Sequence, residues 1–371
     1  MRRLRMGMVG GGPGAFIGPI HRIAAELDRE IELVAGAFGS TLERSRAAGD
    51  AYRIDPARAY GDLAAMLAAE ATRDDPIDFI TIASPNHHHL PAAREALAAG
   101  IPVLSDKPAT ATLAEAHELA GLVADAGLPY GLTYTYSGYP MVREARARIA
   151  AGLVGTVRKV VVEYPQGWLA GESAGKQAEW RLDPARAGEG GAIADIGVHA
   201  FHLAEFVTGL RVTRLLADLA AVVPGRRLDD DCQVLLRFDN GARGILLASQ
   251  IMLGERNGLR LRVYGDRGAL DWRQESPNVL TLHHADGRTE LVQAGDPGLG
   301  DAARAASRTP GGHPEGYLEA FANLYRDFAR NLRGEPGSLV PGIDEGLRGM
   351  AFIHLAVTAS RADAGWIDFE V

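Results

Sequence analysis

The sequence predicts an α/β protein of two domains: a first domain with a parallel sheet between helices, and a second α+β domain with a large, mainly antiparallel open sheet. Three observations predict this architecture. The chain has 371 residues, more than one hydrophobic core usually supports. Strand and helix signals alternate over the first 130 residues, whereas strands dominate from residue 215 onward. We therefore expect domains at residues 1–130 and 131–371.

The composition excludes several classes of protein. Apolar residues make up 47% and charged residues 23%, which is ordinary for a globular chain. The formal net charge of −8 and the lack of a long basic block argue against nucleic-acid binding. Cys232 is the only cysteine, which excludes an intrachain disulfide and favours a reducing compartment. No apolar run approaches the roughly 20 residues that span a bilayer, and no apolar segment follows Arg2-Arg3 as an export signal would require. We expect a cytoplasmic protein with no membrane partner.

Apolar runs that end at turn residues predict the strands of the first domain, and helical apolar periodicity predicts its helices. The strands are expected at 4–9, 32–38, 79–83 and 101–105. The helices are expected at 21–27, 42–48, 63–69, 91–99 and 113–126. Gly100 and Gly127 close the last two helices. Alternation with short links indicates right-handed crossovers, a parallel sheet and helices on both of its faces.

The second domain shows a different pattern. Helices are expected at 142–151, 192–207, 317–332 and 344–360, and the packing of the last two back on the first domain is left open. A β-branched run at 157–164 predicts a strand, and the polar stretch 166–189 predicts a loop over the substrate cleft. The turn signals Asp239-Asn240-Gly241 and Gly265-Asp266-Arg267-Gly268 predict two hairpins, hence an antiparallel sheet. Residues 295–312 are expected to form a loose loop.

A glycine-rich turn follows the first predicted strand. It reads Gly10-Gly11-Gly12-Pro13-Gly14, and Gly18 takes the place of the third glycine of G-x-G-x-x-G after a three-residue insertion. Glycines let backbone amides approach a pyrophosphate, and the following helix supplies positive charge at its N-terminus. The turn predicts a Rossmann domain that binds NAD(H) or NADP(H); a flexible surface loop is the alternative. The expected cofactor contacts here are Gly10, Gly12, Gly14, Phe16 and Ile17.

The end of the second predicted strand leaves the choice between NAD and NADP open. The strand ends in Ala37-Phe38-Gly39-Ser40, without the acid that usually binds the adenosine ribose. Ser40 and Arg44 could hold a 2′-phosphate, which slightly favours NADP. If Arg44 is a solvated charge instead, the cofactor is NAD.

Three further segments resemble one known family. They are Ser84-Pro85-Asn86 with His89, then Asp106-Lys107-Pro108, and the run Gly190-Gly191 to His199, which contains Asp195 and Gly197. Together with the glycine turn they are similar, over nearly the whole chain, to the glucose–fructose oxidoreductase / inositol dehydrogenase (Gfo/Idh/MocA) family. The stretch with Trp180-Arg181, Asp229-Asp230-Asp231 and Ser249-Gln250 is most similar to members that act on cyclic sugars.

The resemblance implies hydride transfer between a nicotinamide and a ring hydroxyl or ketone of a sugar, sugar derivative or cyclitol. It assigns catalysis to Lys107, Asp195 and His199, and cofactor contacts to Ser84, Asn86, His89 and Lys107. Two positions depart from the family pattern. Asp106 stands where a glutamate is usual, and His202 stands where many members carry an acid.

The residue types also suit this chemistry without the resemblance. Alcohol oxidation needs a base, and imidazole, whose ordinary pKa is near 6.5, can serve at neutral pH. Asp195 and His199 are four residues apart on one predicted helix, so they face the same way. Lys107 ends a predicted parallel strand at the edge where open α/β sheets bind ligands, and its ammonium could stabilise an alkoxide. Lys107 as a surface lysine, His199 as a structural histidine, and Asp195, His199 and His202 as metal ligands remain alternatives, although we predict no metal.

Aromatic residues supply the remaining substrate candidates. Tyr134, Tyr136 and Tyr139 lie where the chain should cross between domains, and tyrosines there either contact a sugar or only pack. The full expected substrate set is Tyr136, Tyr139, Trp180, Arg181, Asp195, His199 and His202, with Trp168 and His313 as weaker candidates. Alternative functions are a related enzyme with a non-sugar substrate, a non-catalytic NAD(P)-binding regulator and a metal-dependent hydrolase. The open sheet needs a cover, so we expect a homodimer or homotetramer.

Overall fold

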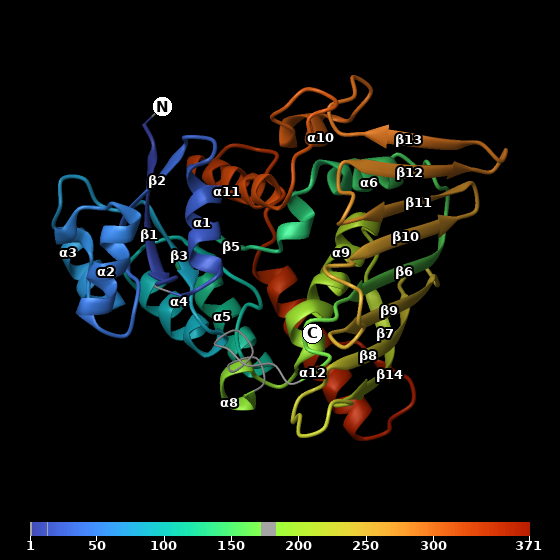
Figure 1. The fold of residues 1–371 in the computed structure, drawn as a ribbon, viewed down its shortest axis with the longest axis horizontal. Helices are drawn as coiled ribbons and strands as arrows, with labels where there is room; N and C mark the ends of the chain where they lie inside the picture. Colours follow the sequence, from blue (N-terminus) through green and yellow to red (C-terminus); the bar gives the residue numbers. More distant parts are fainter. Residues whose placement is uncertain (1, 13, 172–182) are drawn as a thin grey trace. The chain divides into compact units, whose positions relative to one another are not determined.

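The computed structural model describes residues 2–12, 14–171 and 183–371, which form two compact units (Figure 1). The first unit comprises Met1–Thr135 and Phe321–Leu347, and the second comprises Tyr136–Ala320 and Arg348–Val371. The chain thus passes from the first unit to the second, returns, and ends in the second. The sequence predicts a domain boundary after residue 130; in the structure the chain first leaves the first unit after Thr135.

The first unit is built on a five-stranded parallel sheet with the strand order β2-β1-β3-β4-β5. Its strands are β1 (Leu4–Gly10), β2 (Ile31–Ala37), β3 (Phe79–Ala83), β4 (Val103–Ser105) and β5 (Tyr130–Leu132). Chain order reverses between β1 and β3, which makes this the switch point where open α/β sheets bind ligands beyond the carboxyl ends of their strands. Gly10, Ala83 and Ser105 are the last residues of β1, β3 and β4 and lie at this edge.

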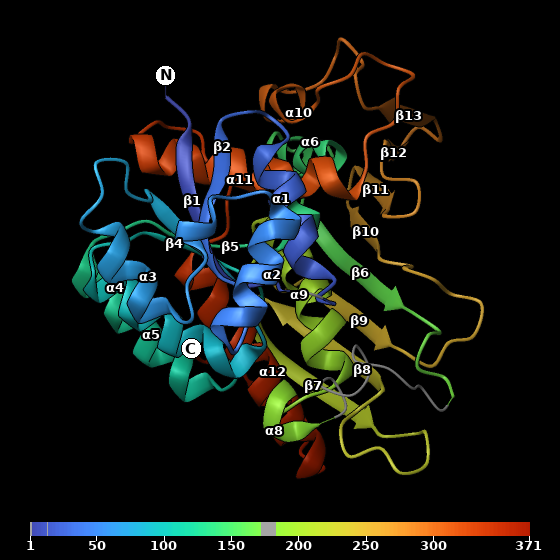
Figure 2. The same ribbon diagram turned by 60° about the vertical axis from the view of Figure 1, so that its left-hand side comes forward.

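Helices cover both faces of this sheet (Figure 2). They are α1 (Ile17–Glu26), α2 (Leu42–Tyr52), α3 (Leu63–Glu70), α4 (His89–Ala98), α5 (Leu113–Ala126) and α11 (Tyr317–Arg333), most of which lies in this unit, with short 3₁₀ turns at Pro56–Arg58 and Asn86–His88. On one face the Thr81 hydroxyl lies 3.1 Å from that of Tyr325 in α11. Successive strand residues face opposite ways, and Ile80 lies on the other face with Gly7 and Met66 of α3. The later α11 thus completes a layer of the first unit.

Local capping explains where several of these helices begin. Thr41 and Asp62 accept hydrogen bonds from the first turns of α2 and α3. Thr112 and Glu115 form a reciprocal capping box at the start of α5. Helix α1 differs, because Phe16 at its N-cap makes no side-chain capping bond within the described part of the chain.

The second unit is built on a nine-stranded sheet with the order β13-β12-β11-β10-β6-β9-β8-β7-β14. The strands are β6 (Val157–Pro165), β7 (Val212–Ala220), β8 (Asp231–Phe238), β9 (Arg243–Ser249), β10 (Arg260–Gly265), β11 (Gly268–Arg273), β12 (Val279–His284), β13 (Thr289–Gln293) and β14 (Ile367–Asp368). Only the β6–β9 pair is parallel among the described pairs. The expected mainly antiparallel sheet and both expected hairpins are confirmed.

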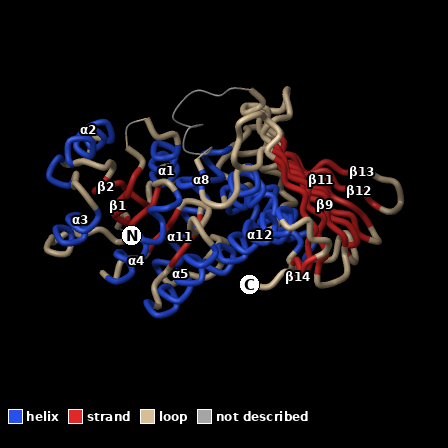
Figure 3. Tube along the Cα trace, turned by 90° about the horizontal axis from the view of Figure 1, so that it is seen from below, coloured by secondary structure: helices blue, strands red, loops and turns tan. Residues whose placement is uncertain are grey.

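Helices lie on one face of the sheet of this unit (Figure 3), where α6 (Pro140–Ala150) and α9 (Val198–Thr208) contact its strands. The other helices of the unit are α8 (Pro184–Ala187), α10 (Asp301–Ala306), which packs on α6, and α12 (Ile343–Arg361), whose first turn belongs to the first unit. A 3₁₀ turn at Thr135–Gly138 precedes α6, and a π-helical turn at Ile193–Gly197 precedes α9. The prediction of a loose loop over residues 295–312 is wrong in part, because α10 lies within it. The buried side of α10 consists of alanines, Ala303 and Ala306. Gly300, the N-cap of α10, donates a hydrogen bond from its amide to Glu144 of α6.

Candidate active site

The glycine turn after β1 leaves no room for side chains. Gly10 has a left-handed φ of 82°, and a Cβ atom there would lie 2.6 Å from the carbonyl oxygen of Ala83. A Cβ atom at Gly12 would lie 2.1 Å from the carbonyl oxygen of Phe38. These separations are shorter than atoms tolerate, so glycine is required for the turn to sit against the ends of both β2 and β3.

The first turn of α1 is equally tight. A Cβ atom at Gly18 would lie 2.3 Å from the carbonyl oxygen of Gly11, and the Tyr52 hydroxyl donates to that same oxygen at 2.6 Å. The turn therefore lies directly against α1, whose N-terminal amides receive no side-chain cap from the described residues. An uncapped N-terminus beside a glycine backbone fits a pyrophosphate. This arrangement supports Gly10, Gly12 and Gly14 as cofactor residues, with Ile17 opening the helix and Phe16 61% exposed beside it.

Beyond β2, the residues expected near the adenosine ribose are open to solvent. Ser40 and Arg44 are both exposed, and the Arg44 amide donates to the Thr41 hydroxyl that caps α2. Ser45, also on α2, accepts from the Phe38 amide and donates to the Gly36 carbonyl, which fixes the end of β2. No acid occupies this strand end.

His89 joins the loops that follow β3 and β4. Its Nδ1 atom lies 2.8 Å from the carbonyl oxygen of Pro108, and its Nε2 atom lies 2.9 Å from that of Ser84. The ring is 1% exposed and Asn86 is 7% exposed. The neighbouring His88 is exposed. His89 therefore holds together the two loops that carry Asn86 and Lys107.

Asp106 positions the backbone of Lys107. One oxygen of its carboxylate accepts from the Lys107 amide at 2.9 Å and from the Thr133 hydroxyl at 2.9 Å. The Lys107–Pro108 peptide bond is cis. Lys107 is half-buried at the carboxyl end of β4. The shorter acid at position 106 thus fastens this loop to the segment after β5.

A buried polar chain lies behind the glycine turn. Nδ1 of His21 in α1 lies 2.7 Å from the Tyr325 hydroxyl, and Thr81 donates onward to the sulfur of Met6. The His21 ring is fully buried, and this burial lowers its pKa to about 4; Asp106 opposes the shift and His89 adds to it. His21 is therefore neutral at physiological pH, and it ties α1 to α11.

In the second unit, one aspartate organises the segment that carries Asp195 and His199. The Asp229 carboxylate accepts from the amides of Gly191 and Ile193, both at 2.7 Å, and from the thiol of buried Cys232. A Cβ atom at Gly191 would lie 2.1 Å from the Asp229 carbonyl oxygen. The glycine pair thus permits Asp229 to cap this helix. The first turn is π-helical, a feature frequent at functional sites.

Asp195 and His199 have separate neighbours in this unit. Asp195 is half-buried, and its carboxylate accepts a hydrogen bond from the side-chain amide of Gln250 at 2.9 Å. The His199 ring is 9% exposed and lies edge-on to Tyr136, with ring centroids 4.9 Å apart and an interplanar angle of 84°. The Tyr164 ring lies 6.4 Å from His199 on a second side. The imidazole therefore has its orientation fixed by aromatic packing.

A polar chain extends from these two tyrosines. Tyr136 and Tyr164 bond through their hydroxyls, and Asn257 contacts both, accepting from Tyr164 at 2.7 Å and donating to Tyr136 at 3.3 Å. The chain continues through Gln166 to the Trp168 indole, which donates at 2.9 Å. Burial raises the pKa of Tyr136, and hydrogen bonds from Tyr164 and Asn257 partly oppose that rise. Both tyrosines are thus neutral hydrogen-bonding groups at physiological pH.

His202 lies in different surroundings from His199. It is 5% exposed and stacks on Phe206, with ring centroids 5.6 Å apart. Burial, together with the nearby positive charges of Arg146 and Arg211, lowers its pKa to about 3. A cationic, aromatic environment of this kind favours a packing role over the sugar contact expected for His202.

The other expected residues are dispersed. Tyr139 is 1% exposed, stacks at 6.3 Å on Tyr136 and accepts from Gln274. Tyr134 is equally buried but belongs to the first unit. His313 is exposed on a loop. Trp180 and Arg181 lie outside the described residues. Within residues 2–12, 14–171 and 183–371, no three histidine, cysteine, aspartate or glutamate side chains are grouped to hold a metal ion.

Sequence reasoning missed Tyr164, Gln166 and Asn257 as members of the site. They come from β6, from the residue after it and from the segment before β10, and only strand pairing brings them together. It also missed Asp229 as a cap, although the run of three aspartates drew attention to that position. No local signal marks Asn257.

These features define a dinucleotide-binding oxidoreductase, and comparison with known proteins gives the same class. Residues 4–134 match the family model described as "Oxidoreductase family, NAD-binding Rossmann fold", and residues 142–271 match the one described as "GFO/IDH/MocA C-terminal domain". The chain belongs to the Gfo/Idh/MocA family and is an NAD-binding oxidoreductase.

Several relatives span the chain almost completely. An uncharacterized oxidoreductase, YfiI of Bacillus subtilis, is 34% identical and covers 99% of this chain and 97% of its own. Levoglucosan dehydrogenase of Pseudarthrobacter phenanthrenivorans is 26% identical, and the match covers 99% of this chain and 98% of that enzyme. An inositol dehydrogenase homolog from Azotobacter vinelandii, solved with NAD+, is 33% identical, covers 99% and 98%, and superposes with a TM-score of 0.95. A second structure under that name holds NADH and myo-inositol, at 32% identity, 99% and 98% coverage and a TM-score of 0.93.

The expected family, fold class and nicotinamide cofactor are thus confirmed. Among the residues that the structure describes, no helix combines the length and the apolar character needed to cross a membrane.

Proposed function

We propose that this oxidoreductase transfers a hydride between nicotinamide and a ring carbon of a sugar, sugar derivative or cyclitol. It would oxidise a ring hydroxyl or reduce the matching ketone. The observation that carries the proposal is the group of polar side chains in the second unit: Asp195 is bonded to Gln250, and Tyr136, which packs on His199, is bonded to Asn257. A polyhydroxylated ring needs such a set of directional donors and acceptors. Relatives named for levoglucosan and inositol support the same substrate class.

His199 is the proposed proton acceptor. When bound, the nicotinamide accepts the hydride, so the protein's task is to remove the proton of the reacting hydroxyl. A histidine whose ring is fixed by Tyr136 and Tyr164 can do so without reorganising. Asp195, held by Gln250, would bind an adjacent hydroxyl. Lys107, held through its backbone by Asp106, would stabilise the negative charge that develops on the oxygen.

The cofactor would be bound by the glycine turn, the N-terminus of α1 and the loops that His89 joins. NAD fits the matched family model and the relatives' structures. We further propose that Ser40 and Arg44 let the chain accept NADP as well, because the end of β2 carries no acid to repel a 2′-phosphate.

The test is a survey of turnover on purified full-length protein. Reduction of NAD+ and of NADP+ is followed by absorbance with a panel of monosaccharides, anhydrosugars and inositols, and with hydroxy acids as the non-sugar control. The proposal expects turnover with at least one cyclic polyol and loss of that turnover in Asp195→Asn, with NADH still bound. Turnover on hydroxy acids alone would contradict the substrate class. NADH binding without turnover on any panel member would contradict the whole proposal.

We also propose that the protein forms a homodimer or homotetramer through the outer face of the second sheet. Leu235, Ile245 and Leu291 on this face are 42%, 38% and 60% exposed, although they are large apolar side chains. Exposed apolar groups on one sheet face mark interaction surfaces. Light scattering should give a mass of two or four chains, and Ile245→Glu should reduce it.

A further inference from the structure

An arginine-lined cavity lies in the first unit, at the amino ends of β1 and β2. Its volume is about 370 Å³, and its lining is Arg2, Arg3, Arg29, Glu30, Arg330, Arg333 and Glu335. The lining comes from the residues before β1, the turn before β2 and the end of α11. The glycine turn lies at the opposite end of β1, seven residues away, or roughly 20 Å at about 3.4 Å per residue. The cavity is therefore separate from the dinucleotide site.

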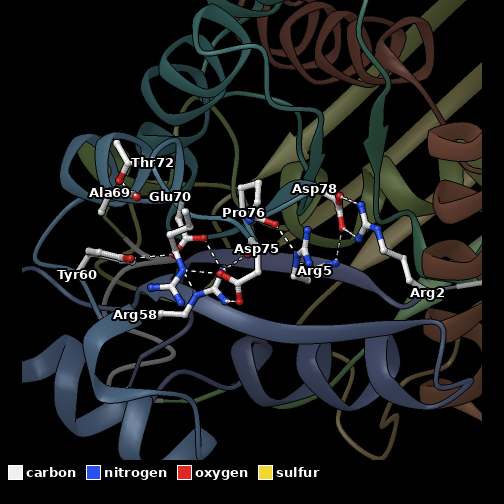
Figure 4. Close-up of polar contacts among 11 residues, drawn as sticks. Arg2, Arg5, Arg58, Tyr60, Ala69, Glu70, Thr72, Asp75, Pro76 and Asp78 are labelled. Atoms are coloured by element: carbon white, nitrogen blue, oxygen red, sulfur yellow. Dashed lines mark hydrogen bonds and ion pairs between the residues drawn. The ribbon is translucent and has the colours of Figure 1, made fainter.

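Arginines dominate the lining of the cavity in an acidic protein. Its five arginines and two glutamates sum to a formal charge of +3, and the carboxylates of Asp78, Glu32 and Asp327, which pair with Arg2, Arg3 and Arg330, lie beside it and offset this charge. Carboxylates hold several of the guanidiniums in place. Arg2 forms a bidentate pair with Asp78 at 2.6 and 2.7 Å, as Figure 4 shows, and Arg333 pairs with Glu30. A guanidinium has five N–H donors and a carboxylate engages two, so the pairs leave donors for a ligand.

Arg29 is the most informative member of the lining. Its φ of 59° lies in the left-handed region, which a bulky residue adopts at a conformational cost. Its side chain is exposed and makes no hydrogen bond or ion pair with any residue that the structure describes. Glycine would suit this turn better, so the fold holds, at a strained position, a cation that no described residue pairs with. Strain of this kind is frequent at ligand-binding positions.

We propose that this cavity binds a small anion carrying two or more phosphate groups. Its volume lies within the range of small-molecule sites, roughly 300–1,000 Å³. Arginines from three separate segments can surround several phosphate oxygens with paired hydrogen bonds. The limited size of the cavity and the negative net charge of the chain are unsuited to a nucleic-acid strand, which needs an extended basic track.

The test is calorimetric titration of the full chain with pyrophosphate and tripolyphosphate. NADH is present at saturation so that the dinucleotide site is filled, and the ionic strength is about 0.15 M so that weak surface attraction is screened. We expect one ion bound per chain. Arg29→Gln and Arg330→Gln should each weaken binding about tenfold, the loss typical of one charged hydrogen bond. Arg53→Gln is the matched control, because Arg53 is also exposed with a left-handed φ of 58° but lies outside the cavity.

Thermal unfolding gives a second measurement. Arg29→Gly removes both the strain and the cation, so it should raise the melting temperature without anion and abolish the further rise on adding tripolyphosphate. Arg53→Gly should raise the melting temperature and keep that further rise. The proposal is overturned if the wild type binds neither anion at this ionic strength, or if Arg53→Gln weakens binding as much as Arg29→Gln, which would indicate an adventitious ion only.

Discussion

The two units hold their functional groups by different means. The first unit uses backbone: Gly10, Gly12 and Gly18 bring main-chain atoms so close that a single added methyl group would collide with a neighbouring carbonyl. The second unit uses side chains: Gln250 holds Asp195, and two tyrosines hold the ring of His199. A diphosphate is the same in every dinucleotide and can be bound by amides, whereas hydroxyl groups differ between substrates and need side-chain contacts. Loss of one unit's contacts should therefore impair one ligand and spare the other.

The most severe test of this comparison is a methyl group at Gly18. In Gly18→Ala the new Cβ atom would lie 2.3 Å from the Gly11 carbonyl oxygen, so α1 must move from the turn. We expect NADH affinity, measured by calorimetry, to fall about a hundredfold, the equivalent of about 3 kcal/mol of overpacking. Gly121→Ala is the control, since a Cβ atom there meets no atom within 4 Å. Equal affinities in the two variants would show that the turn tolerates side chains.

Lys107 sharpens the comparison, because it belongs to the first unit but is assigned to chemistry. Lys107→Ala should lower kcat by about a hundredfold, since a charge that stabilises the developing alkoxide is lost. NADH binding should stay measurable, because the contacts proposed for the diphosphate are main-chain. Lys159→Ala, on β6, should leave kcat unchanged. A variant at position 107 that keeps kcat and loses NADH would reassign this lysine to cofactor binding.

Acid should destabilise the first unit through His21. Its folded-state pKa is about 4 against an ordinary 6.5, so the unfolded chain binds more protons between these values. The stabilising contribution is therefore present above pH 6.5 and is lost as pH falls toward 4, by about 3 kcal/mol in total. Denaturant unfolding at several pH values should show that the free energy of unfolding decreases as pH falls in this range, and His21→Asn should reduce this dependence. His117→Asn, on the exposed side of α5, should leave the dependence unchanged. If His21→Asn also leaves it unchanged, His21 is not the cause.

The smallest expected effect concerns Arg44. If it contacts a 2′-phosphate, Arg44→Ala should weaken NADPH binding by several-fold, about 1 kcal/mol for an exposed charge pair, with NADH unaffected. Arg46→Ala, two residues along the same exposed helix, is the control. If the wild type binds NADH more tightly than NADPH, and Arg44→Ala changes neither affinity, then Arg44 is a solvent-exposed charge that makes no contact with the cofactor.

The same contrast explains how much the sequence could predict. The parallel sheet, the glycine turn and the loop of Lys107 follow from short patterns, because each depends on residues close together in the chain. The π-helical turn before His199 depends on Asp229, whose carboxylate accepts a hydrogen bond from the amide of Ile193, 36 positions earlier in the chain. The Tyr136–Tyr164–Asn257 group depends on segments up to 121 residues apart. The return of α11 to the first unit rests on Tyr325 meeting His21, a contact that no local pattern marks.

The central claim, that the second unit removes the proton while the first binds the dinucleotide, is tested most directly by the pH profile of His199→Asn. Alcohol oxidation by the wild type should rise with pH through one ionisation. In His199→Asn this rise of the oxidation rate with pH should flatten, and oxidation should slow by about 10²–10⁴-fold. The NADH affinity of the same sample should be unchanged. His283→Asn, an exposed histidine of the same unit, should keep the wild-type profile. A His199→Asn protein that keeps the wild-type rise with pH, or that loses NADH binding, would contradict this division of roles.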